Sequence, residues 1–486
     1  KANSMEQDIL NLINGQLQAA HGGQWLDNVE PATGQNYSRI ARSGADDVEE
    51  AVAAARRAFP EWRAWSPADR RAVLMRLADK VAEHADMLAE AEARDNGKPV
   101  SVARTVDIPR AEHNLRFYAS AAEQFSSESH TMGDGTVNYT LRKPLGVVAC
   151  ISPWNLPLYL FTWKIAPALA SGNCVVAKPS EVTPMTAYLL GTWAKEVGFP
   201  DGVLNILQGL GPEVGQAMVE HHYVRAVSFT GGTATGAAIS ALAAPKFKKL
   251  SLELGGKNAT VVFDDCDFDE AVSTAVRAAF SNQGQICLCG SRILIQEALY
   301  DRFRDAMVAK VSKMRIGDPM DPSTRMGAVV SRGHRDKVLA AIDTARGEGG
   351  RILCGGGRHQ PGEPRLKGGF FVQPTLIEGL DHTCVTNREE IFGPVATLQP
   401  FKDEQEALGL VNATKYGLSA SVWTKDLKRA HRFAAGIDTG MVWLNCWLVR
   451  DLRTPFGGTR HSGVGREGGY NSMRFFTEPQ NVCIKL

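Results

Sequence analysis

The sequence lacks several features that mark whole classes of protein. No stretch of the 486 residues approaches the roughly 18 consecutive apolar residues of a membrane-spanning helix. The 54 basic and 53 acidic residues nearly cancel, which argues against nucleic acid or an anionic membrane as a partner. The N-terminus lacks the charged-then-apolar pattern of a signal peptide. We expect Met5 to be the natural start and the four residues before it to be an expression remnant.

Cysteine and histidine are present without the spacings that build disulfide frameworks or metal sites. The nine cysteines show no short regular spacing, which indicates reduced thiols and predicts a cytoplasmic location. The eleven histidines form no His-Glu-x-x-His pattern, and no paired cysteine ligands occur. A zinc hydrolase is therefore unsupported, and no metal site is expected.

The apolar pattern that is present predicts an α/β fold. At roughly 150 residues per domain, the length suggests two or three domains. We expect the first 120 residues to be mostly helical, with an alternating strand at 136–141. Short apolar strands separated by helices follow, in one series over 146–229 and another over 260–314. Two such series predict two doubly wound parallel-sheet lobes with a cleft between them.

A glycine-rich turn and a Lys–Glu pair suggest a dinucleotide site. Residues 229–233 follow a predicted strand and open a helix, where backbone N–H groups and the helix dipole can face a phosphate. The turn lacks the three spaced glycines of the Rossmann fingerprint, so alone it is equally consistent with a tight connection. Lys178 and Glu181 can hold the hydroxyls of an adenosine ribose, and Glu181 would repel a 2′-phosphate, favouring NAD. A solvated surface pair is the alternative.

A candidate nucleophile and a candidate base complete the chemistry. Cys287 ends Gln283-Gly-Gln-Ile-Cys287, flanked by glycine and polar amides, and Glu253 lies upstream in Leu252-Glu-Leu-Gly-Gly-Lys257. A thiol and a carboxylate are the two groups that oxidation of an aldehyde through a thioester requires. An inert buried thiol is the common alternative.

Together these motifs resemble those of the aldehyde dehydrogenase superfamily, from about residue 20 to the C-terminus. In the family's order they are Pro153-Trp154-Asn155, Lys178-Pro-Ser-Glu181, residues 229–233, 252–257 and 283–287, Glu389-Glu390-Ile-Phe-Gly-Pro394, and residues 455–458. The resemblance implies an NAD-binding domain of residues 1–125 and 146–255 and a catalytic domain of residues 256–465. It also implies an arm of residues 126–145 and 466–486 that pairs subunits into a homodimer or homotetramer.

The resemblance also implies a role for each motif residue. Cys287 would attack the aldehyde, the Asn155 amide and the Cys287 N–H would stabilise the oxyanion, and Glu253 would activate water. Glu390 would hold the nicotinamide ribose, with Phe392 packed beside it. The remaining NAD contacts would be Pro153, Trp154, Lys178, Ser180, Glu181, Phe229, Thr230, Gly231, Gly232, Thr233 and Leu254. Without the resemblance, Asn155 could be a helix cap, and Glu253 and Glu390 could be solvent-facing residues.

Arginines mark the expected substrate tunnel. Arg450 and Arg453 fall where the family forms the tunnel mouth, and Arg110 falls in the helix that lines the opposite wall. Because a guanidinium fits a carboxylate, converging arginines would select a semialdehyde that carries one. Ile286 and Leu288, beside the thiol, complete the expected substrate contacts. Local ion pairs of Arg450 and Arg453, for example with Asp451, are the alternative.

Residues 447–453, 465–469 and 481–486 resemble those of one branch, the 2-hydroxymuconic and 2-aminomuconic semialdehyde dehydrogenases of aromatic-ring degradation. This resemblance implies NAD-dependent oxidation of a small-molecule semialdehyde to a dicarboxylate. A broad-specificity dehydrogenase of aliphatic, aromatic or betaine aldehydes remains open, as does a catalytically silent binding or structural protein on the same fold. A CoA-acylating relative is less consistent, because that branch generally lacks the base matched here by Glu253.

Overall fold

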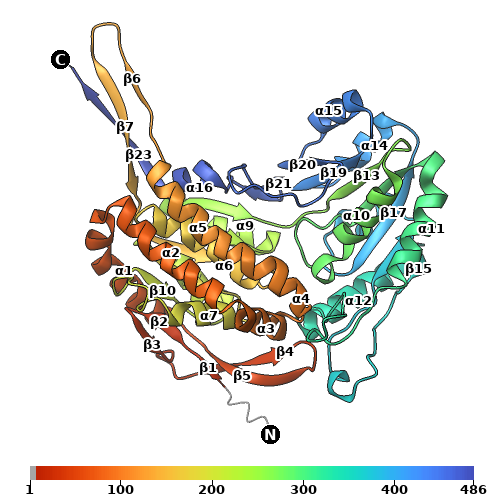
Figure 1. Ribbon diagram of the computed structural model, residues 1–486, viewed down its shortest axis with the longest axis horizontal. Coiled ribbons are helices and arrows are strands. Elements are labelled where there is room, and N and C mark those ends of the chain that lie inside the picture. Colours follow the sequence, from red (N-terminus) through yellow and green to blue (C-terminus); the bar gives the residue numbers. More distant parts are fainter. Residues whose placement is uncertain (1–6, 486) are drawn as a thin grey trace.

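Two mostly parallel sheets with helices on their faces form the framework of the computed structural model, which describes residues 7–485 (Figure 1). The predicted α/β fold with two doubly wound lobes is confirmed. The first sheet has the order β22 (Gly463–Val464), β12 (Lys249–Glu253), β11 (Val224–Thr230), β8 (Val147–Ile151), β9 (Cys174–Lys178), β10 (Leu204–Ile206), β2 (Asn11–Ile13) and β3 (Gln16–Gln18).

The central strands of this sheet are buried on both faces. Every residue of β8 and β9 is buried, as expected for the continuous apolar runs of parallel strands. α6 (Pro157–Ala170) packs on β8 and β9, and α2 (Pro67–Glu83) and α5 (Ile108–Gln124) pack on α6. The remaining helices around this sheet are α1 (Ala45–Ala64), α3 (Ala85–Asn96), α4 (Val100–Val102), α7 (Met185–Thr192), α8 (Gln216–Glu220) and α9 (Thr233–Ala243).

The second sheet is built from the later part of the chain. Its order is β15 (Arg351–Cys354), β16 (Thr375–Glu378), β17 (Val395–Phe401), β14 (Arg292–Gln296), β13 (Ala259–Val262), β19 (Ser419–Trp423) and β20 (Met441–Leu444). All pairs but β15–β16 are parallel. Its helices are α10 (Phe268–Phe280), α11 (Tyr300–Val311), α12 (Arg332–Gly347), α13 (Val385–Arg388), α14 (Glu404–Val411) and α15 (Leu427–Gly436).

The expectation that the first 120 residues are mostly helical is wrong for their first third. That segment forms β2 and β3 of the first sheet and a separate sheet of β1 (Gln7–Ile9), β5 (Gln35–Ala41) and β4 (Trp25–Glu30). β2 joins β3 through a turn at Asn14 and Gly15, both with positive φ, which is a recognisable hairpin signal. Met5 lies outside the described residues.

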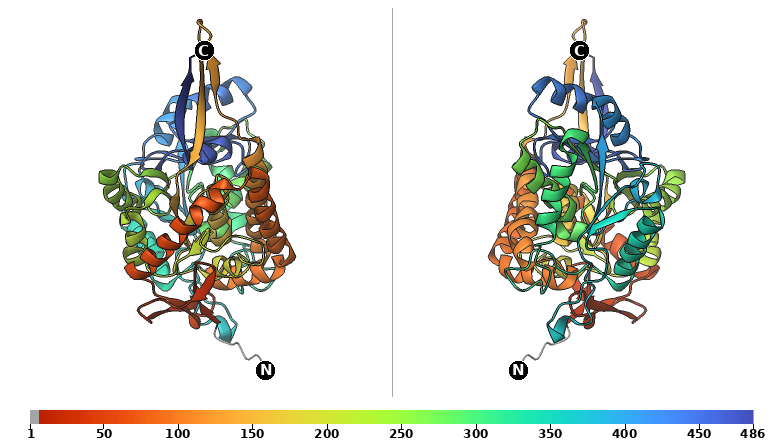
Figure 2. Two further views of the ribbon diagram at one scale, coloured as in Figure 1. Left: turned by 90° about the vertical axis from the view of Figure 1, so that its left-hand side faces the viewer. Right: turned by 90° about the vertical axis from the view of Figure 1, so that its right-hand side faces the viewer.

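A three-stranded arm projects from the body (Figures 1 and 2). β7 (Val137–Pro144) lies between β6 (Ser129–Thr131) and β23 (Thr477–Ile484), and β7 and β23 pair antiparallel over their full length. The strand expected at 136–141 and the C-terminal tail thus meet in one sheet. α16 (Gly469–Phe475) leads from the body into β23.

The strand register brings the predicted site motifs to one edge of the first sheet. Ile151, which precedes the Pro153-Trp154-Asn155 turn, pairs with Lys178, and Phe229 pairs with Ile151 on its other side. Thr230 pairs with Glu253. The carboxyl ends of β8, β9, β11 and β12 therefore share an edge, where open α/β sheets bind ligands. Within residues 7–485, no helix is long and apolar enough to cross a membrane.

Candidate active site

A cavity of about 580 Å³ opens at the carboxyl ends of β8, β9 and β11. Nine of the residues expected to contact NAD line it: Pro153, Trp154, Lys178, Ser180, Glu181, Phe229, Thr230, Gly231 and Gly232. Its wall also contains residues that belong to none of the predicted motifs. They include Gly211, Pro212 and Gly215 and, from α8 and α9, Val219, Ala238, Ile239 and Leu242. These small and apolar residues build a slot that a flat base can enter.

The polar end of the cavity fits the ribose and phosphates of a dinucleotide. Lys178 is buried and donates to the Glu181 carboxylate over 3.3 Å, and burial lowers its pKa. The pair is thus part of the cavity wall, not a solvated surface pair. Gly232 precedes the first turn of α9, and nothing lies within 4 Å of the position that a Cβ there would take. A phosphate can therefore approach the backbone at the helix N-terminus.

Two further predicted NAD residues, Thr233 at the start of α9 and Leu254 directly after β12, are not among the residues that line the cavity. The Thr233 hydroxyl donates to the His461 carbonyl, and Leu254 fills the space beside Gly236, where a Cβ would lie 2.5 Å from its side chain. Thr233 is thus held by a hydrogen bond and Leu254 by packing against α9, and neither lines the cavity.

Glu390 and Phe392, the residues predicted to hold the nicotinamide ribose, contact Gly256 and Trp154. Phe392 has a φ of 60°, and its ring meets that of Trp154 edge-on at 5.2 Å. The Glu390 carboxylate accepts the Gly256 N–H over 3.0 Å, and burial raises the pKa of Glu390 to about 7. A Cβ on Gly255 would lie 2.2 Å from this carboxylate, so a larger residue there would displace the Glu390 side chain.

The loop before Cys287 is held in an uncommon conformation. Asn282, Gln283 and Gly284 have φ values of 54°, 60° and 71°, in the left-handed region. Buried amides fix the loop: the Gln283 side chain accepts the Gly327 N–H, and the Gln285 side chain accepts the Val330 N–H. Ile286 and Leu288 are buried on either side of the thiol.

The Cys287 thiol and the Asn155 amide, which is predicted to donate to the oxyanion, both contact this loop or belong to it. The Asn155 amide donates to the Gln285 carbonyl over 3.0 Å, which leaves its second N–H for a substrate oxyanion. Across the described chain the Cys287 N–H donates to no protein acceptor. Asn258, which carries no predicted role, donates to the Cys287 carbonyl over 2.6 Å. Burial and the charges of Glu253 and Glu390 raise the pKa of Cys287, so the resting thiol is protonated.

Glu253 belongs to a buried group of charges that the motifs did not reveal. Its carboxylate accepts from the Thr230 hydroxyl over 2.7 Å. The Lys164 ammonium lies 4.0 Å from Glu253 and 3.2 Å from Glu467. Burial, followed by the charge of Glu467, raises the pKa of Glu253 to about 8. Residues 465–469 resemble those of one branch of the family, but the sequence alone assigns Glu467 itself no role.

The three candidate substrate arginines lie in different environments. The Arg450 guanidinium lies 3.9 Å from the ring centre of Phe456 and 5.3 Å from that of Trp163. Its Nε is buried without a hydrogen-bond partner, and within residues 7–485 it forms no ion pair. Arg453 is 79% exposed and pairs with Asp451 over 2.6 Å. Arg110 is partly buried on α5. Asp451 thus neutralises Arg453 and leaves Arg450 without a counterion.

The wall of this dinucleotide-sized cavity includes Trp154, which precedes Asn155, and Thr230, which donates to Glu253, and the Asn155 amide contacts the loop that carries the Cys287 thiol. A dehydrogenase that works through a thiol adduct needs a thiol, an amide donor and a carboxylate of this kind. Comparison with known proteins agrees with this class. A model of the aldehyde dehydrogenase family matches residues 18–482. The chain therefore belongs to the aldehyde dehydrogenase family, which confirms the resemblance stated from the motifs.

Relatives along the full length are similarly named. The chain is 48% identical over 462 residues to a 2-aminomuconic semialdehyde dehydrogenase of Danio rerio, covering 95% of each chain. It is 44% identical to a 2-hydroxymuconic semialdehyde dehydrogenase of Pseudomonas sp. strain CF600, covering 99% of this chain and 100% of that one. An NAD+ complex of aldehyde dehydrogenase from Bacillus cereus matches with a TM-score of 0.96 and 36% identity, covering 99% and 97%.

The raised pKa of Glu253 predicts a pH dependence for thioester hydrolysis. A general base works as the carboxylate, so the rate should rise about tenfold per pH unit up to about pH 8 and then level. Glu467→Gln removes the neighbouring negative charge and should move this profile to lower pH. The measurement is the hydrolysis rate of the acyl enzyme formed with 4-nitrophenyl acetate. Glu389→Gln, at an exposed carboxylate, is the control, and an unmoved profile in Glu467→Gln contradicts the assignment.

Proposed function

We propose that this protein uses NAD to oxidise a semialdehyde carrying a distal carboxylate, of the 2-hydroxymuconic or 2-aminomuconic type, to the dicarboxylate. The relatives named above act on such substrates by name, and the cavity fits a dinucleotide. The observation that carries the proposal is Arg450, a cation between aromatic rings with no acidic partner among the described residues. Leaving such a charge uncompensated costs free energy, which a substrate carboxylate would recover.

The buried groups divide the reaction into two steps. Cys287 releases its thiol proton to solvent and forms a C–S bond to the aldehyde carbon, while the second Asn155 N–H and the Cys287 N–H hold the oxyanion. The chemistry that NAD supplies when bound is acceptance of the hydride from that carbon. Glu253 then takes a proton from water, which attacks the thioester, releases the acid and returns the thiol. Trp154, which lines the cavity, and its neighbours Phe392 and Glu390 would orient the nicotinamide ribose.

Arg450→Ala should weaken use of 6-oxohexanoate far more than use of hexanal, which lacks only the carboxylate. Loss of a charge-assisted hydrogen bond of about 1.5–3 kcal/mol corresponds to roughly a 10- to 100-fold loss in kcat/KM. Arg450→Lys should recover part of the loss, because an ammonium keeps the charge without the planar fork. Steady-state NADH formation measures all of these rates.

Arg453→Ala is the matched control, because Arg453 is already paired with Asp451 on the surface. It should change kcat/KM for 6-oxohexanoate by less than about threefold, as expected for an exposed ion pair. Equal losses with 6-oxohexanoate and hexanal in Arg450→Ala contradict the carboxylate proposal and favour a broad-specificity aldehyde dehydrogenase.

The preference for NAD is proposed to rest on Glu181. Its carboxylate, held by buried Lys178, would repel the 2′-phosphate of NADP. Glu181→Ala should raise the ratio of kcat/KM for NADP over NAD by about tenfold, equivalent to about 1.4 kcal/mol. Glu220→Ala, which removes an exposed carboxylate from α8 outside the cavity lining, should leave the ratio unchanged. An unchanged ratio in Glu181→Ala contradicts the assignment.

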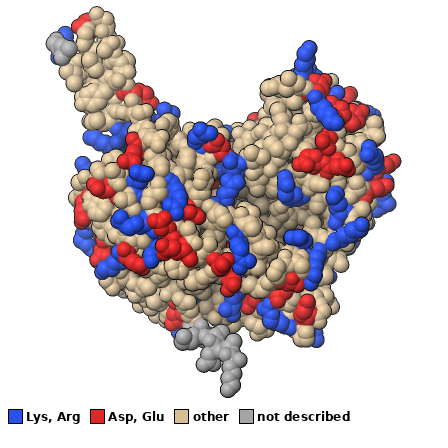
Figure 3. All heavy atoms as spheres, in the orientation of Figure 1, with Lys and Arg blue, Asp and Glu red and all other residues tan. Residues whose placement is uncertain are grey.

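We also propose that the arm pairs subunits in a homodimer or homotetramer. β23 has an open edge in the single chain, and such edges pair readily with another copy. The face of the arm seen in Figure 3 is mostly uncharged, unlike the body. Sedimentation should give a dimer or tetramer mass, and a monomer at all concentrations contradicts the proposal.

The nine free thiols support the further proposal of a cytoplasmic location.

The domain division also remains a proposal. The strands of the two sheets fall on either side of residue 256, which supports an NAD-binding part of residues 1–125 and 146–255 and a catalytic part of residues 256–465. One strand departs from this division: β22 lies at 463–464 and pairs with β12 of the first sheet. A strand of the catalytic part therefore joins the first sheet beside Glu253, which pairs with Gly463.

A further inference from the structure

A buried ion pair lies behind the turn that carries Asn155. The Lys98 ammonium contacts the Asp107 carboxylate, and both side chains are 0% exposed. Lys98 ends the segment Asn96-Gly-Lys98 after α3, and Asp107 ends a stretch of π-helix between α4 and α5. A π-helical turn changes the direction of the side chains that follow it, and here it brings Asp107 against Lys98.

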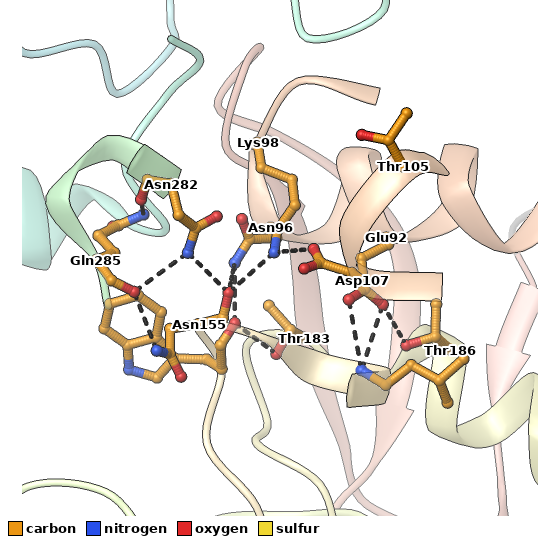
Figure 4. Close-up of polar contacts among 12 residues, drawn as sticks. Glu92, Asn96, Lys98, Thr105, Asp107, Asn155, Thr183, Thr186, Asn282 and Gln285 are labelled. Carbon is orange, nitrogen blue, oxygen red and sulfur yellow. Dashed lines mark hydrogen bonds and ion pairs between the residues drawn. The ribbon is translucent and has the colours of Figure 1, made fainter. Parts of the chain in front are cut away.

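Lys98 also donates to the main-chain carbonyl of Asn155 over 3.1 Å (Figure 4). The Asn282 amide donates to the same carbonyl over 2.9 Å from the opposite side. Asn282 donates in addition to the Gln285 carbonyl, which accepts the Asn155 side chain. The backbone of Asn155 is therefore clamped between Lys98 and the loop that ends at Cys287.

The neighbouring polar groups of this turn are held in the same way. The Trp154 carbonyl accepts from Asn96 over 2.9 Å and from the Thr183 hydroxyl over 3.3 Å. The Leu158 N–H, at the start of α6, points to the Glu92 carboxylate, which also accepts from Thr186. Side chains from outside the turn thus bind its main chain on both sides of Asn155 (Figure 4).

Stability alone gives little reason for such a pair. Burying a lysine and an aspartate costs several kcal/mol, and apolar replacements of equal volume often fold as well or better. The pair can instead serve to place the oxyanion donor, because such a donor must lie within about 2.7–3.1 Å of the oxyanion. A charged donor on the Asn155 carbonyl fixes the position of the Asn155 backbone, and with it the position of the side-chain amide. Supporting contacts of this kind determine how precisely the groups of a site are held.

We propose that Lys98 is a positioning residue for the oxyanion donor: its ammonium, held by Asp107, fixes the Asn155 backbone so that the side-chain amide faces the carbon bound to Cys287. Lys98 does not touch the substrate and acts only through Asn155. The inference rests on the proposed roles of Cys287 and Asn155.

The test compares Asp107→Asn with the double variant Lys98→Met/Asp107→Asn. In Asp107→Asn the Lys98 side chain keeps its place against the Asn155 carbonyl but loses the carboxylate that holds it, so this variant should fall between the wild type and the double variant. The double variant removes both charges, so it leaves no buried carboxylate unpaired. Acylation of Cys287 by 4-nitrophenyl acetate needs the oxyanion donors but no NAD. Alkylation by iodoacetamide occurs at a tetrahedral carbon and forms no oxyanion. The double variant should acylate about 10- to 100-fold more slowly and alkylate within about threefold.

The same comparison in an Asn155→Ala background separates positioning from general support. If Lys98 acts through the Asn155 amide, removing the ammonium has no further effect on acylation once that amide is gone. The positioning role is overturned if Asp107→Asn and the double variant acylate at equal rates, or if alkylation falls as much as acylation. It is also overturned if removal of the ammonium still slows acylation in the Asn155→Ala background. Unchanged acylation in Asn155→Ala alone instead overturns the proposed role of Asn155.

Discussion

The parallel register of β8, β9, β11 and β12 is the constraint on which the site depends. Backbone hydrogen bonds align the last residues of these strands, so that each emerging segment delivers its polar groups to the same edge. The turn with Asn155, the Lys178–Glu181 pair, the glycine turn and Glu253 come from distant parts of the chain. A shift of one residue in any of these pairings would turn the corresponding side chain into the core.

Burial gives these groups their chemistry. A carboxylate in water would be fully ionised at neutral pH, whereas the pKa of Glu253 is raised to about 8 by burial and by Glu467. The pKa of the Cys287 thiol is raised as well, which keeps it protonated and less reactive towards adventitious oxidants and electrophiles. Cys287 and Glu253 are thus both predominantly neutral at rest.

Site residues that belong to a contiguous sequence motif could be predicted. Residues that only the folded chain brings to the site could not. Cys287, Asn155 and the glycine turn lie in contiguous motifs that the family resemblance identifies, and nine of the expected cofactor residues do line the cavity. Lys98, Lys164 and Glu467 reach the site from helices and loops far away in the sequence, where a charged residue usually indicates a solvated surface. The strands before residue 42 include two local hairpins, β2–β3 and β4–β5, whose turns at Asn14-Gly15 and Gly34 are visible in the sequence. The pairing of β2 with the remote β10 lay beyond such local signals.

The left-handed run at Asn282, Gln283 and Gly284 has a consequence for how the two halves of the site can move. A Cβ on Gly284 would lie 2.0 Å from the Gly393 carbonyl, so the nucleophile loop rests directly on the backbone that follows Glu390 and Phe392. No side chain intervenes to absorb a displacement. The thiol and the groups expected to hold the nicotinamide ribose must therefore travel together, and an attempt to re-engineer the distance between nucleophile and coenzyme has to rebuild both loops at once.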